Sequence, residues 1–214
     1  MKKLGYRVLK HETYRAMPWR NGRGSTREIA REPATGEQFA WRLSLADIEV
    51  DGDFSAYPGY SRALVLVAGN RLHLQFRGHR HCRLSPAKRG TRFEGGWRTY
   101  CAVPDGRCTD LSLIVRKGSA GRPTFIVRAP RVLRLEATRR IELSGESYGA
   151  LYVLEGSVAI TGSIRARARI LRAKDTALFS PGPRQKLTLR NVGRSSVQLV
   201  LLGWRAGRSN ELGR

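Results

Sequence analysis

Apolar residues along this chain alternate with polar ones or run in short blocks, and few recur at the spacing of three and four that marks an amphipathic helix. Such runs, bounded by glycine, proline and asparagine, are typical of β-strands joined by turns. Nine segments show the pattern most clearly: Phe39–Ile48, Ala63–Ala68, Arg71–Arg77, Leu111–Arg116, Arg131–Glu136, Ala150–Glu155, Ser157–Thr161, Thr176–Ser180 and Val197–Gly203. The pattern therefore predicts an all-β chain, built as a sandwich, a barrel or a jelly roll.

The stretch Met17–Ile29 has a composition that a strand or a simple turn does not need. Trp19 supplies a large rigid face, Asn21 is both a donor and an acceptor, and Gly22 and Gly24 let the backbone approach another group closely. A glycine-hinged loop that leads into a polar strand would suit the wall of a site for a small polar ligand. The alternative is an N-terminal arm that is pinned by Trp19, with the glycines in a bulge or tight turn. Taken alone, these residues slightly favour the alternative.

The same stretch closely resembles the signature Met-Pro-Trp-(Lys/Arg)-Asn-Gly-x-Gly-x-Thr-Arg-Glu-Ile of the HutD/Ves family. Three later blocks are similar to others of that family, in the same order and spacing. Residues 39–46 are similar to FxWRxSxA, residues 51–62 to DGxFSxFPGxxR, and residues 110–118 to D(F/L)NLMxRRG, with Ser112 where the family usually has Asn. The blocks cover the first 118 residues, and the likeness is loose beyond them.

Two segments, Ala63–Leu74 and Gly149–Ile160, look like copies of a strand, a glycine turn and a second strand. The second copy is similar to the cupin hairpin YVLEGxxxI, and Ala173–Gly182 is similar to the second cupin motif, GDxxxxPxG. Together with the family resemblance, this likeness implies a bicupin with two β-jelly-roll (double-stranded β-helix) halves. The halves are expected at residues 1–118, which carry the family blocks, and 119–214, with the join near Lys117–Thr124.

Composition sets the class of protein that carries these motifs. A chain of 214 residues with 41% hydrophobic content fits one or two compact units with ordinary cores. No apolar run approaches the roughly 20 residues of a membrane-spanning helix, and Met1–Lys3 does not lead into the apolar core of a signal peptide. We therefore expect a cytoplasmic protein without a membrane partner. Three cysteines without paired spacing are expected to be free thiols: Cys82, Cys101 and Cys108.

The formal net charge is +23, which raises the question of a polyanionic partner. The arginines are spread along the chain, whereas nucleic-acid footprints cluster, and a GC-rich coding bias would give the same composition. The densest run is Ser163–Arg172, where a period of two places Arg165, Arg167 and Arg169 on one strand face and Ile170 on the other. We interpret this arginine stripe as the solvent-exposed face of a sheet. Nucleic acid would then bind only non-specifically.

Many cupins are metalloenzymes, and a metal needs several histidine or carboxylate ligands that converge. The second-half motif ends in Pro183–Lys186, with no histidine where a metal-binding cupin would carry one. His79 and His81 share a strand face, but arginines flank them and no glutamate follows at cupin spacing. No catalytic triad or phosphate-binding loop stands out either. The sequence therefore predicts no metal, no cofactor and no assignable catalytic residue.

Strand alternation places Arg42 and Ser44 on one face of their strand, and Asp110 and Ser112 on one face of theirs. If these faces line the interior of a barrel, the arginines would surround an anionic ligand and Asp110 would orient one of them. In the alternative arrangement, the apolar faces point inward and these polar residues face water. The predicted ligand-binding residues are Trp19, Asn21, Thr26, Arg27, Arg42, Ser44, Arg62, Asp110 and Ser112.

The resemblance further implies a metal-free protein that binds a small carboxylate, such as formylglutamate or urocanate, and modulates histidine utilisation or, as in the Ves subgroup, a stress response. A homodimer is one possible assembly. Two other hypotheses stay open. One is a metal-independent isomerase or hydrolase that uses Asp110 or Glu28 as its base, and the other is a polyanion-binding module that acts through the arginine stripe.

Overall fold

The computed structural model describes residues 6–19, 24–36, 38–118, 125–143, 147–162, 167–181 and 185–206. Within them every element is a β-strand except the short 3-10 helix η1 (His11–Thr13). Each of the nine segments with a clear strand pattern contains an observed strand, which confirms the all-β prediction. No helix in this described part of the chain has the length and apolar character needed to cross a membrane.

The chain divides into two compact units. The N-terminal unit comprises residues 14–130, and the C-terminal unit comprises residues 131–206 together with the described residues 6–13. The first strand of the chain thus belongs to the C-terminal unit, and the division after Pro130 lies beyond the expected join at Lys117–Thr124.

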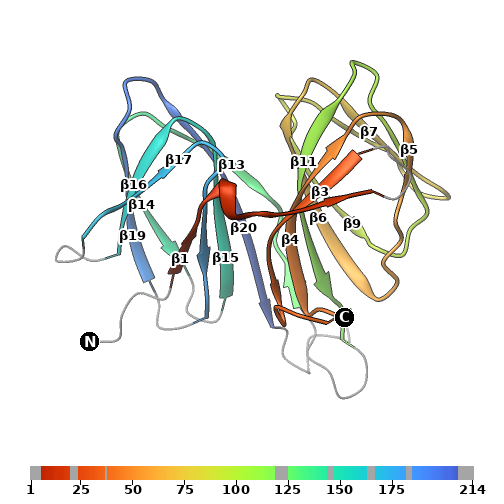
Figure 1. The fold of residues 1–214 in the computed structure, drawn as a ribbon, viewed down its shortest axis with the longest axis horizontal. Helices are drawn as coiled ribbons and strands as arrows, with labels where there is room; N and C mark the ends of the chain where they lie inside the picture. The colour runs from red at the N-terminus through yellow and green to blue at the C-terminus, as the bar shows by residue number, and fades with distance from the viewer. Residues whose placement is uncertain are drawn as a thin grey trace. The chain divides into compact units, whose positions relative to one another are not determined.

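The N-terminal unit contains a long and a short antiparallel sheet (Figure 1). In spatial order, the strands of the long sheet are β2 (Arg15–Pro18), β3 (Gly24–Glu32), β4 (Trp41–Ile48), β11 (Cys108–Arg116), β6 (Tyr60–Ala68) and β9 (Gly90–Glu94). Those of the short sheet are β5 (Gly52–Phe54), β10 (Thr99–Ala102), β7 (Leu72–Phe76) and β8 (Cys82–Leu84). The last strand of this unit along the chain is β12 (Phe125–Val127).

The C-terminal unit repeats this plan. The strands of its long sheet are, in order, β1 (Tyr6–Leu9), β18 (Thr176–Phe179), β15 (Ser147–Glu155), β20 (Val197–Ala206) and β13 (Arg131–Leu135). Those of its short sheet are β14 (Thr138–Leu143), β19 (Gln185–Asn191), β16 (Ser157–Thr161) and β17 (Arg169–Arg172).

Eight consecutive strands have the same spatial order in the two units. The order β4-β11-β6-β9 of one long sheet matches β13-β20-β15-β18 of the other, and β5-β10-β7-β8 matches β14-β19-β16-β17. The two similar sequence segments are equivalent hairpins of this repeat: β6 passes through Gly69 into β7, and β15 passes through Gly156 into β16. Both glycines have left-handed backbone angles, φ +88° and +84°, which other residues rarely adopt. Both predicted segments are therefore observed as a strand, a glycine turn and a second strand.

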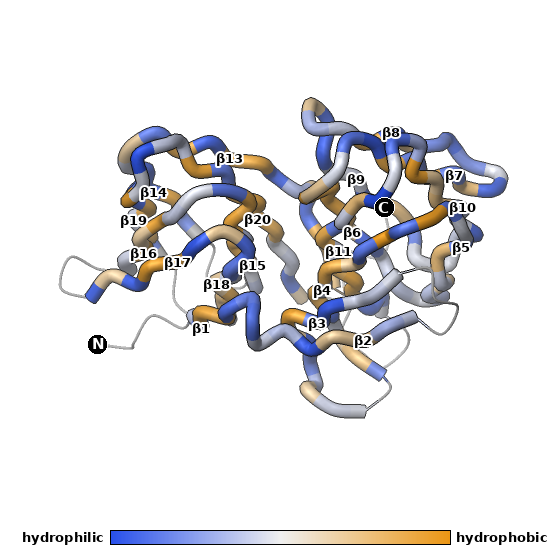
Figure 2. Tube along the Cα trace, turned by 45° about the horizontal axis from the view of Figure 1, so that its top comes forward, coloured by the Kyte–Doolittle hydropathy of each residue, from blue (hydrophilic) through white to orange (hydrophobic). Residues whose placement is uncertain are grey.

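Each unit has its own apolar core between its two sheets, and hydrophobic segments follow the strands of both units (Figure 2). The core of the N-terminal unit is formed by Ile48, Leu64, Leu66, Leu72, Leu74, Phe76, Leu84, Phe93, Cys101, Val103 and Cys108. The core of the C-terminal unit is formed by Leu133, Leu135, Ile141, Leu151, Val153, Val158, Ile160, Leu171, Ala177, Phe179, Leu187, Leu189, Val197 and Leu199. Burial of these side chains supplies most of the driving force for each unit, at roughly 25 cal/mol per Å² of apolar surface.

The central strands of the N-terminal long sheet are buried on both faces. The face that carries Arg42 continues to Ile48 in the core, while Leu43 and Leu45 on the opposite face are 0% and 1% exposed. The alternative arrangement, in which the polar residues face water, does not describe these strands, because both of their faces are buried. The polar residues on this inner face are enclosed as well.

The arginine stripe is only partly visible, because residues 163–166 lie outside the described residues. The strand begins at Arg169, and Ile170 is 49% exposed whereas Leu171 is fully buried. The predicted phase of the alternation was therefore wrong here: Leu171, and not Ile170, supplies the apolar face, because it packs into the core of the C-terminal unit.

Candidate functional site

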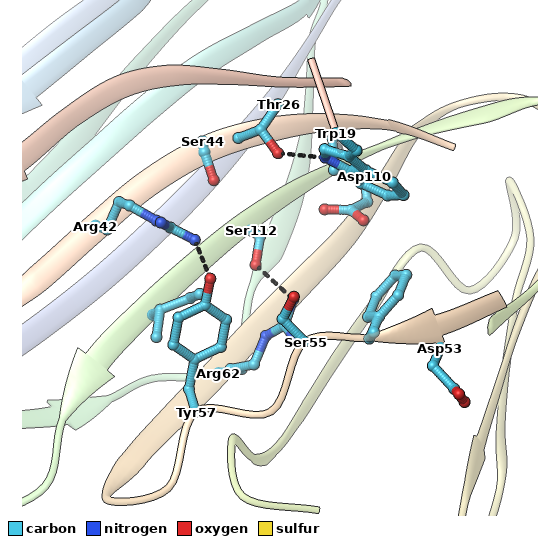
Figure 3. A pocket seen from close by; sticks show the side chains of 13 residues that line it. Trp19, Thr26, Arg42, Ser44, Asp53, Ser55, Tyr57, Arg62, Asp110 and Ser112 are labelled. Carbon is cyan, nitrogen blue, oxygen red and sulfur yellow. Dashed lines mark hydrogen bonds between the residues drawn. The ribbon is translucent and has the colours of Figure 1, made fainter. Parts of the chain in front are cut away.

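A cavity of about 380 Å³ lies at one end of the N-terminal unit, on the inner face of its long sheet (Figure 3). Strands β3, β4, β6 and β11 supply the floor, and the segment from β5 to β6 supplies a wall. The lining residues are Trp19, Thr26, Arg42, Ser44, Ala46, Asp53, Phe54, Ser55, Tyr57, Arg62, Asp110, Ser112 and Ile114. Seven of the nine predicted ligand-binding residues are among them.

Strand register arranges the floor of the cavity in rows. Arg42 and Arg62 both lie opposite Ile114, Ser44 lies opposite Ser112, and Ala46 lies opposite Asp110. Successive rows are two residues apart, which is roughly 6.5 Å along a strand. The floor therefore runs from an arginine row, through a serine row, to a row that contains Asp110.

The two arginines are held by aromatic rings and hydroxyls. The Arg42 guanidinium lies 5.1 Å from the Phe39 ring centroid and 5.3 Å from that of Tyr57, and its Nη2 donates to the Tyr57 hydroxyl at 2.8 Å. Arg62 is 7% exposed and lies 5.2 Å from the Phe54 ring centroid and 5.1 Å from that of Phe93. Neither arginine forms an ion pair with a described residue, so both charges are available to a ligand.

Arg62 also donates from Nη2 to Ser112 Oγ at 3.4 Å, while the Nε atoms of both arginines are buried without a hydrogen-bond partner among the described residues. Burial lowers the pKa of Arg62, and the nearby charge of Arg42 lowers it further, against the opposing effects of Asp110 and Tyr57. A guanidinium still keeps its proton at neutral pH. Two neighbouring positive charges in a partly enclosed site favour an anion.

Asp110 is fully buried, and among the described residues no donor reaches either of its carboxylate oxygens. The expected contact between Asp110 and an arginine is not formed. Burial raises the pKa of Asp110 to about 7; the positive charge of Arg62 opposes this shift and the negative charge of Asp47 adds to it. The carboxylate is therefore partly protonated near neutral pH and has unused hydrogen-bonding capacity.

Trp19 and Thr26 of the motif line one side of the cavity. Trp19 Nε1 donates to Thr26 Oγ1 at 2.8 Å (Figure 3). The Trp19 amide donates to the Gly24 carbonyl at 2.9 Å. A Cβ atom at Gly24 would overlap the carbonyl oxygen of Asp47 and lie 3.1 Å from the Trp19 ring. Trp19 therefore combines the two roles considered for the stretch Met17–Ile29: it pins the N-terminal arm and it lines the cavity.

Two predicted site residues are not part of the lining. Arg27 is next to Thr26 on β3, so its side chain points to the opposite face, where its Nη2 lies 2.8 Å from Asp47 Oδ2. Asp47 also accepts from Thr109 Oγ1 at 2.7 Å. Asn21 lies outside the described residues.

Sequence reasoning missed the second wall, which contains Asp53, Phe54, Ser55 and Tyr57. The signal was present, since these residues belong to the family block at residues 51–62, but strand alternation says nothing about a segment that is mostly loop. Tyr57 connects this wall to the floor through its hydrogen bond with Arg42.

The HutD family profile matches residues 11–197. The chain belongs to the HutD family. This confirms the resemblance that the four sequence blocks carry.

Two sequence relatives extend this assignment. An uncharacterised 21.2 kDa protein from the hutC 3′ region of Pseudomonas putida is 37% identical over 108 residues, which is 50% of this chain and 56% of that protein. Protein Ves of Escherichia fergusonii is 44% identical over 64 residues, which is 28% of this chain and 34% of that protein. The chain therefore spans only part of the length of these relatives, and the first of them ties the family to a histidine-utilisation gene region.

Solved structures share the fold over almost the whole chain. A conserved protein of unknown function from Pseudomonas aeruginosa PAO1 is 28% identical, with a TM-score of 0.80 over 94% of this chain and 98% of that one. HutD from Pseudomonas fluorescens SBW25, solved in a formate condition, is 24% identical with a TM-score of 0.75 over 95% and 100%. Oxalate decarboxylase of Lactobacillus farciminis, in a formate complex, is 10% identical with a TM-score of 0.67 over 96% and 86%, and this likeness extends to the fold alone.

In this HutD family member, the histidines that resembled metal ligands have structural roles. His81 Nδ1 accepts from the Phe76 amide at 3.1 Å, and His79 stacks on Trp97 with 3.8 Å between ring centroids. One group of three potential ligands occurs among the described residues, namely His11, Glu12 and Asp175 in the C-terminal unit.

Asp175 of that group is already engaged. Its oxygens accept from Lys10 Nζ at 2.7 Å, the Arg172 amide at 2.9 Å and the His11 amide at 3.3 Å. This carboxylate fastens β1 to the C-terminal unit.

Three polar positions of the cavity correspond to a glycine or a leucine in the C-terminal unit. Counted back from the glycine turns, Arg62 corresponds to Gly149. Asp110 pairs with Leu66, whose counterpart Val153 pairs with Leu199. By the same register, Ser112 corresponds to Leu201. The fold therefore does not require a charged residue at either place, and the polar cavity is a property of the N-terminal unit.

Proposed function

We propose that this HutD family protein binds a small carboxylate in the cavity of its N-terminal unit. One observation carries the proposal: Arg42 and Arg62 face the same cavity, and neither forms an ion pair with a described residue. An enclosed charge without an opposite charge is costly, so a site that holds the buried Arg62 beside the half-buried Arg42 has a use for an anion.

The chemistry of the arginine row favours a carboxylate. A guanidinium presents a planar fork of N–H donors that matches the two oxygens of a carboxylate, and charge-assisted bonds of this kind are the stronger ones. Stacking on Phe39, Phe54 and Phe93 holds the guanidinium planes while it consumes no N–H donor. The serine hydroxyls of the next row offer further hydrogen bonds to a ligand that extends along the floor.

The family connection suggests which carboxylates to test first. Histidine utilisation proceeds through carboxylates such as urocanate and formylglutamate, and a relative of this chain comes from a hut gene region. The proposed role is therefore a binding protein that responds to such an intermediate and modulates the pathway. The same binding function would serve a stress-related role, in line with the Ves relative, if the carboxylate came from outside the histidine pathway.

A thermal-shift screen of histidine-pathway intermediates and simple carboxylates tests the proposal, followed by calorimetry on each compound that stabilises the protein. A ligand that binds only the folded state raises stability by mass action, by about 2.7 kcal/mol at 100 times its Kd. We expect at least one carboxylate to do so, and its neutral amide or alcohol analogue to fail. If no carboxylate raises the melting temperature at millimolar concentration, the proposed function is wrong.

The repeated strand order supports a further part of the proposal, that the two units are the two jelly-roll halves of a bicupin. Eight strands recur in the same spatial order, and the turns at Gly69 and Gly156 are equivalent. An experimental structure of the whole chain tests this arrangement, and halves that cannot be superposed strand for strand would exclude it.

A second candidate function, a metal-independent enzyme, is favoured by Asp110. A carboxyl group with a pKa of about 7 that faces a cavity is suited to take or give a proton at neutral pH. Turnover of the identified carboxylate, followed by NMR over hours, would reveal such chemistry. The enzyme hypothesis requires that Asp110→Asn abolish turnover while the carboxylate still binds.

A further inference from the structure

The buried carboxylate of Asp110 is the feature of the cavity that a carboxylate site does not explain. A ligand carboxylate beside it would be repelled, and Leu199 at the equivalent place shows that the fold needs no acid there. Both Asp110 oxygens are nevertheless buried without a donor from the described residues. An unsatisfied buried acceptor of this kind costs about 1–3 kcal/mol or more, so its presence requires a reason.

The position of Asp110 indicates what it would meet. It lies one row beyond Ser112, whose hydroxyl accepts from Arg62 Nη2 at 3.4 Å. Neighbouring rows are roughly 6.5 Å apart. A ligand whose carboxylate meets the arginines, and which lies along the floor, therefore brings atoms a few bonds away from that carboxylate next to Asp110.

No described residue donates to Asp110 at this end of the cavity. The indole N–H of Trp19, which lines the same cavity, donates to Thr26 Oγ1 at 2.8 Å. Ala46, opposite Asp110 on β4, has no polar side chain. A ligand with an N–H group would supply the donor that the described residues do not provide.

We propose that the cavity selects small carboxylates that also carry an N–H donor, and that Asp110 accepts the hydrogen bond from that donor. This inference rests on the carboxylate site proposed above. The class includes acylamino, imidazole and ammonium carboxylates, and it leaves out plain aliphatic acids and diacids whose second carboxylate would face Asp110. In the occupied site, the charges of the two arginines are balanced by the ligand carboxylate and by Asp110.

A pair of probes that differ only in the donor tests this selectivity. In 4-acetamidobutanoate an amide N–H stands where 6-oxoheptanoate has a methylene group, and N-butylacetamide keeps the amide but lacks the carboxylate. Calorimetry is done at pH 8, where Asp110 is largely ionised. We expect 4-acetamidobutanoate to bind about 10- to 100-fold more tightly than 6-oxoheptanoate, from one charge-assisted hydrogen bond, and N-butylacetamide not to bind.

Variants of Asp110 separate this contact from a general effect on the pocket. Asp110→Leu, which installs the residue found at the equivalent place, should bring the affinity ratio of the two carboxylates close to one. Asp110→Asn keeps an acceptor without the charge and should lower the ratio to a few-fold. Asp105→Asn removes a carboxylate that pairs with Arg71 on a distant turn and should leave the ratio unchanged.

The outcomes distinguish this inference from the proposed function. Equal affinities of the two carboxylates for the parent protein, or a preference that survives Asp110→Leu, would overturn the role of Asp110 and leave the carboxylate site intact. Failure of both carboxylates to bind the parent, together with an empty carboxylate screen, would overturn both.

Discussion

The two units of this chain share one strand order but have different residues at equivalent inner positions. At the inner positions where the N-terminal unit has Arg62 and Asp110, the C-terminal unit has Gly149 and Leu199. A Cβ atom added at Gly149 would lie 3.5 Å from the Phe179 ring, which is tilted against the Tyr6 ring with 5.5 Å between centroids. One unit keeps a polar cavity at a place where the other is filled with apolar side chains, so the fold tolerates either solution.

The units also contain one buried aspartate each, in contrasting environments. Burial alone would raise the pKa of Asp175, but hydrogen bonds from Lys10 and from the amides of Arg172 and His11 outweigh it and lower that pKa. Asp110 has no such donors, and its pKa rises to about 7. The carboxylate of Asp175 accepts hydrogen bonds from its own chain, as a structural carboxylate does. The carboxylate of Asp110 accepts none from the described residues, as expected of a group that binds a ligand.

The largest effect is expected when an arginine is placed at Gly149, the position of the C-terminal unit that corresponds to Arg62. Gly149→Arg would bury a guanidinium among Phe179 and its apolar neighbours without a partner, at a cost of about 5 kcal/mol or more. Urea denaturation should show severe destabilisation or failure to fold. Gly149→Ala is the control, because its Cβ would make ordinary contacts of 3.5 Å and longer, and it should change stability by less than about 1 kcal/mol. A near-parental Gly149→Arg protein would show that this interior is not packed as described.

The second largest effect is expected from the reverse exchange, in which Asp110 of the N-terminal unit is replaced by leucine, the residue at the equivalent position of the C-terminal unit. Asp110→Leu should raise the free energy of unfolding by about 2–4 kcal/mol at pH 8, because it removes a buried, unpaired carboxylate. In the parent, the folded-state pKa of about 7 lies above the usual value for aspartate, so ionisation disfavours the folded state. Parent stability should fall as the pH rises from about 4 to about 7.

Urea titrations at pH 5, 6, 7 and 8 measure this difference. The advantage of Asp110→Leu over the parent should grow across that window and level off above it. A variant that is less stable than the parent at every pH would mean that the chain itself satisfies Asp110.

A smaller effect concerns ligand affinity. Arg42→Met keeps much of the side-chain volume but removes the guanidinium, and should weaken carboxylate binding by about 1.5–3 kcal/mol, or roughly 10- to 100-fold. Arg167→Met, an exposed arginine of the C-terminal unit, controls for the loss of positive charge. Calorimetry with the carboxylate from the screen compares them, and unchanged affinity of the Arg42 variant would exclude the arginine row as the binding site.

The smallest effect concerns the satisfied aspartate. Asp175→Asn should cost about 1–2 kcal/mol at pH 7 through the loss of its charge-assisted bond with Lys10. Because the folded-state pKa of Asp175 is lowered, its full contribution is present above the ordinary pKa and is lost as the pH falls through the folded-state pKa. Denaturation should therefore show a larger difference from the parent at pH 7 than at pH 3. An equal deficit at both values would point to lost packing and not to lost charge.

Much of this site could be predicted from the sequence, since seven of the nine proposed residues line one cavity. Arg42, Ser44, Asp110 and Ser112 follow from a period of two, which any strand imposes on its side chains. Arg27 was misplaced because it stands next to Thr26, and neighbours on a strand point to opposite faces. Tyr57 was missed because a loop has no such period.

The sequence by itself determined the all-β class, the repeated glycine hairpins and the groups of residues that share a strand face, because these depend on local backbone geometry. Only the tertiary structure decided that both faces of β4 and β11 are buried and that the polar face encloses a cavity. It also decided that Arg42 and Arg62 share a row, since this depends on the pairing of both strands with β11. Alternation fixes which side chains lie together on one strand, but the register between distant strands is set by the packing of the whole unit.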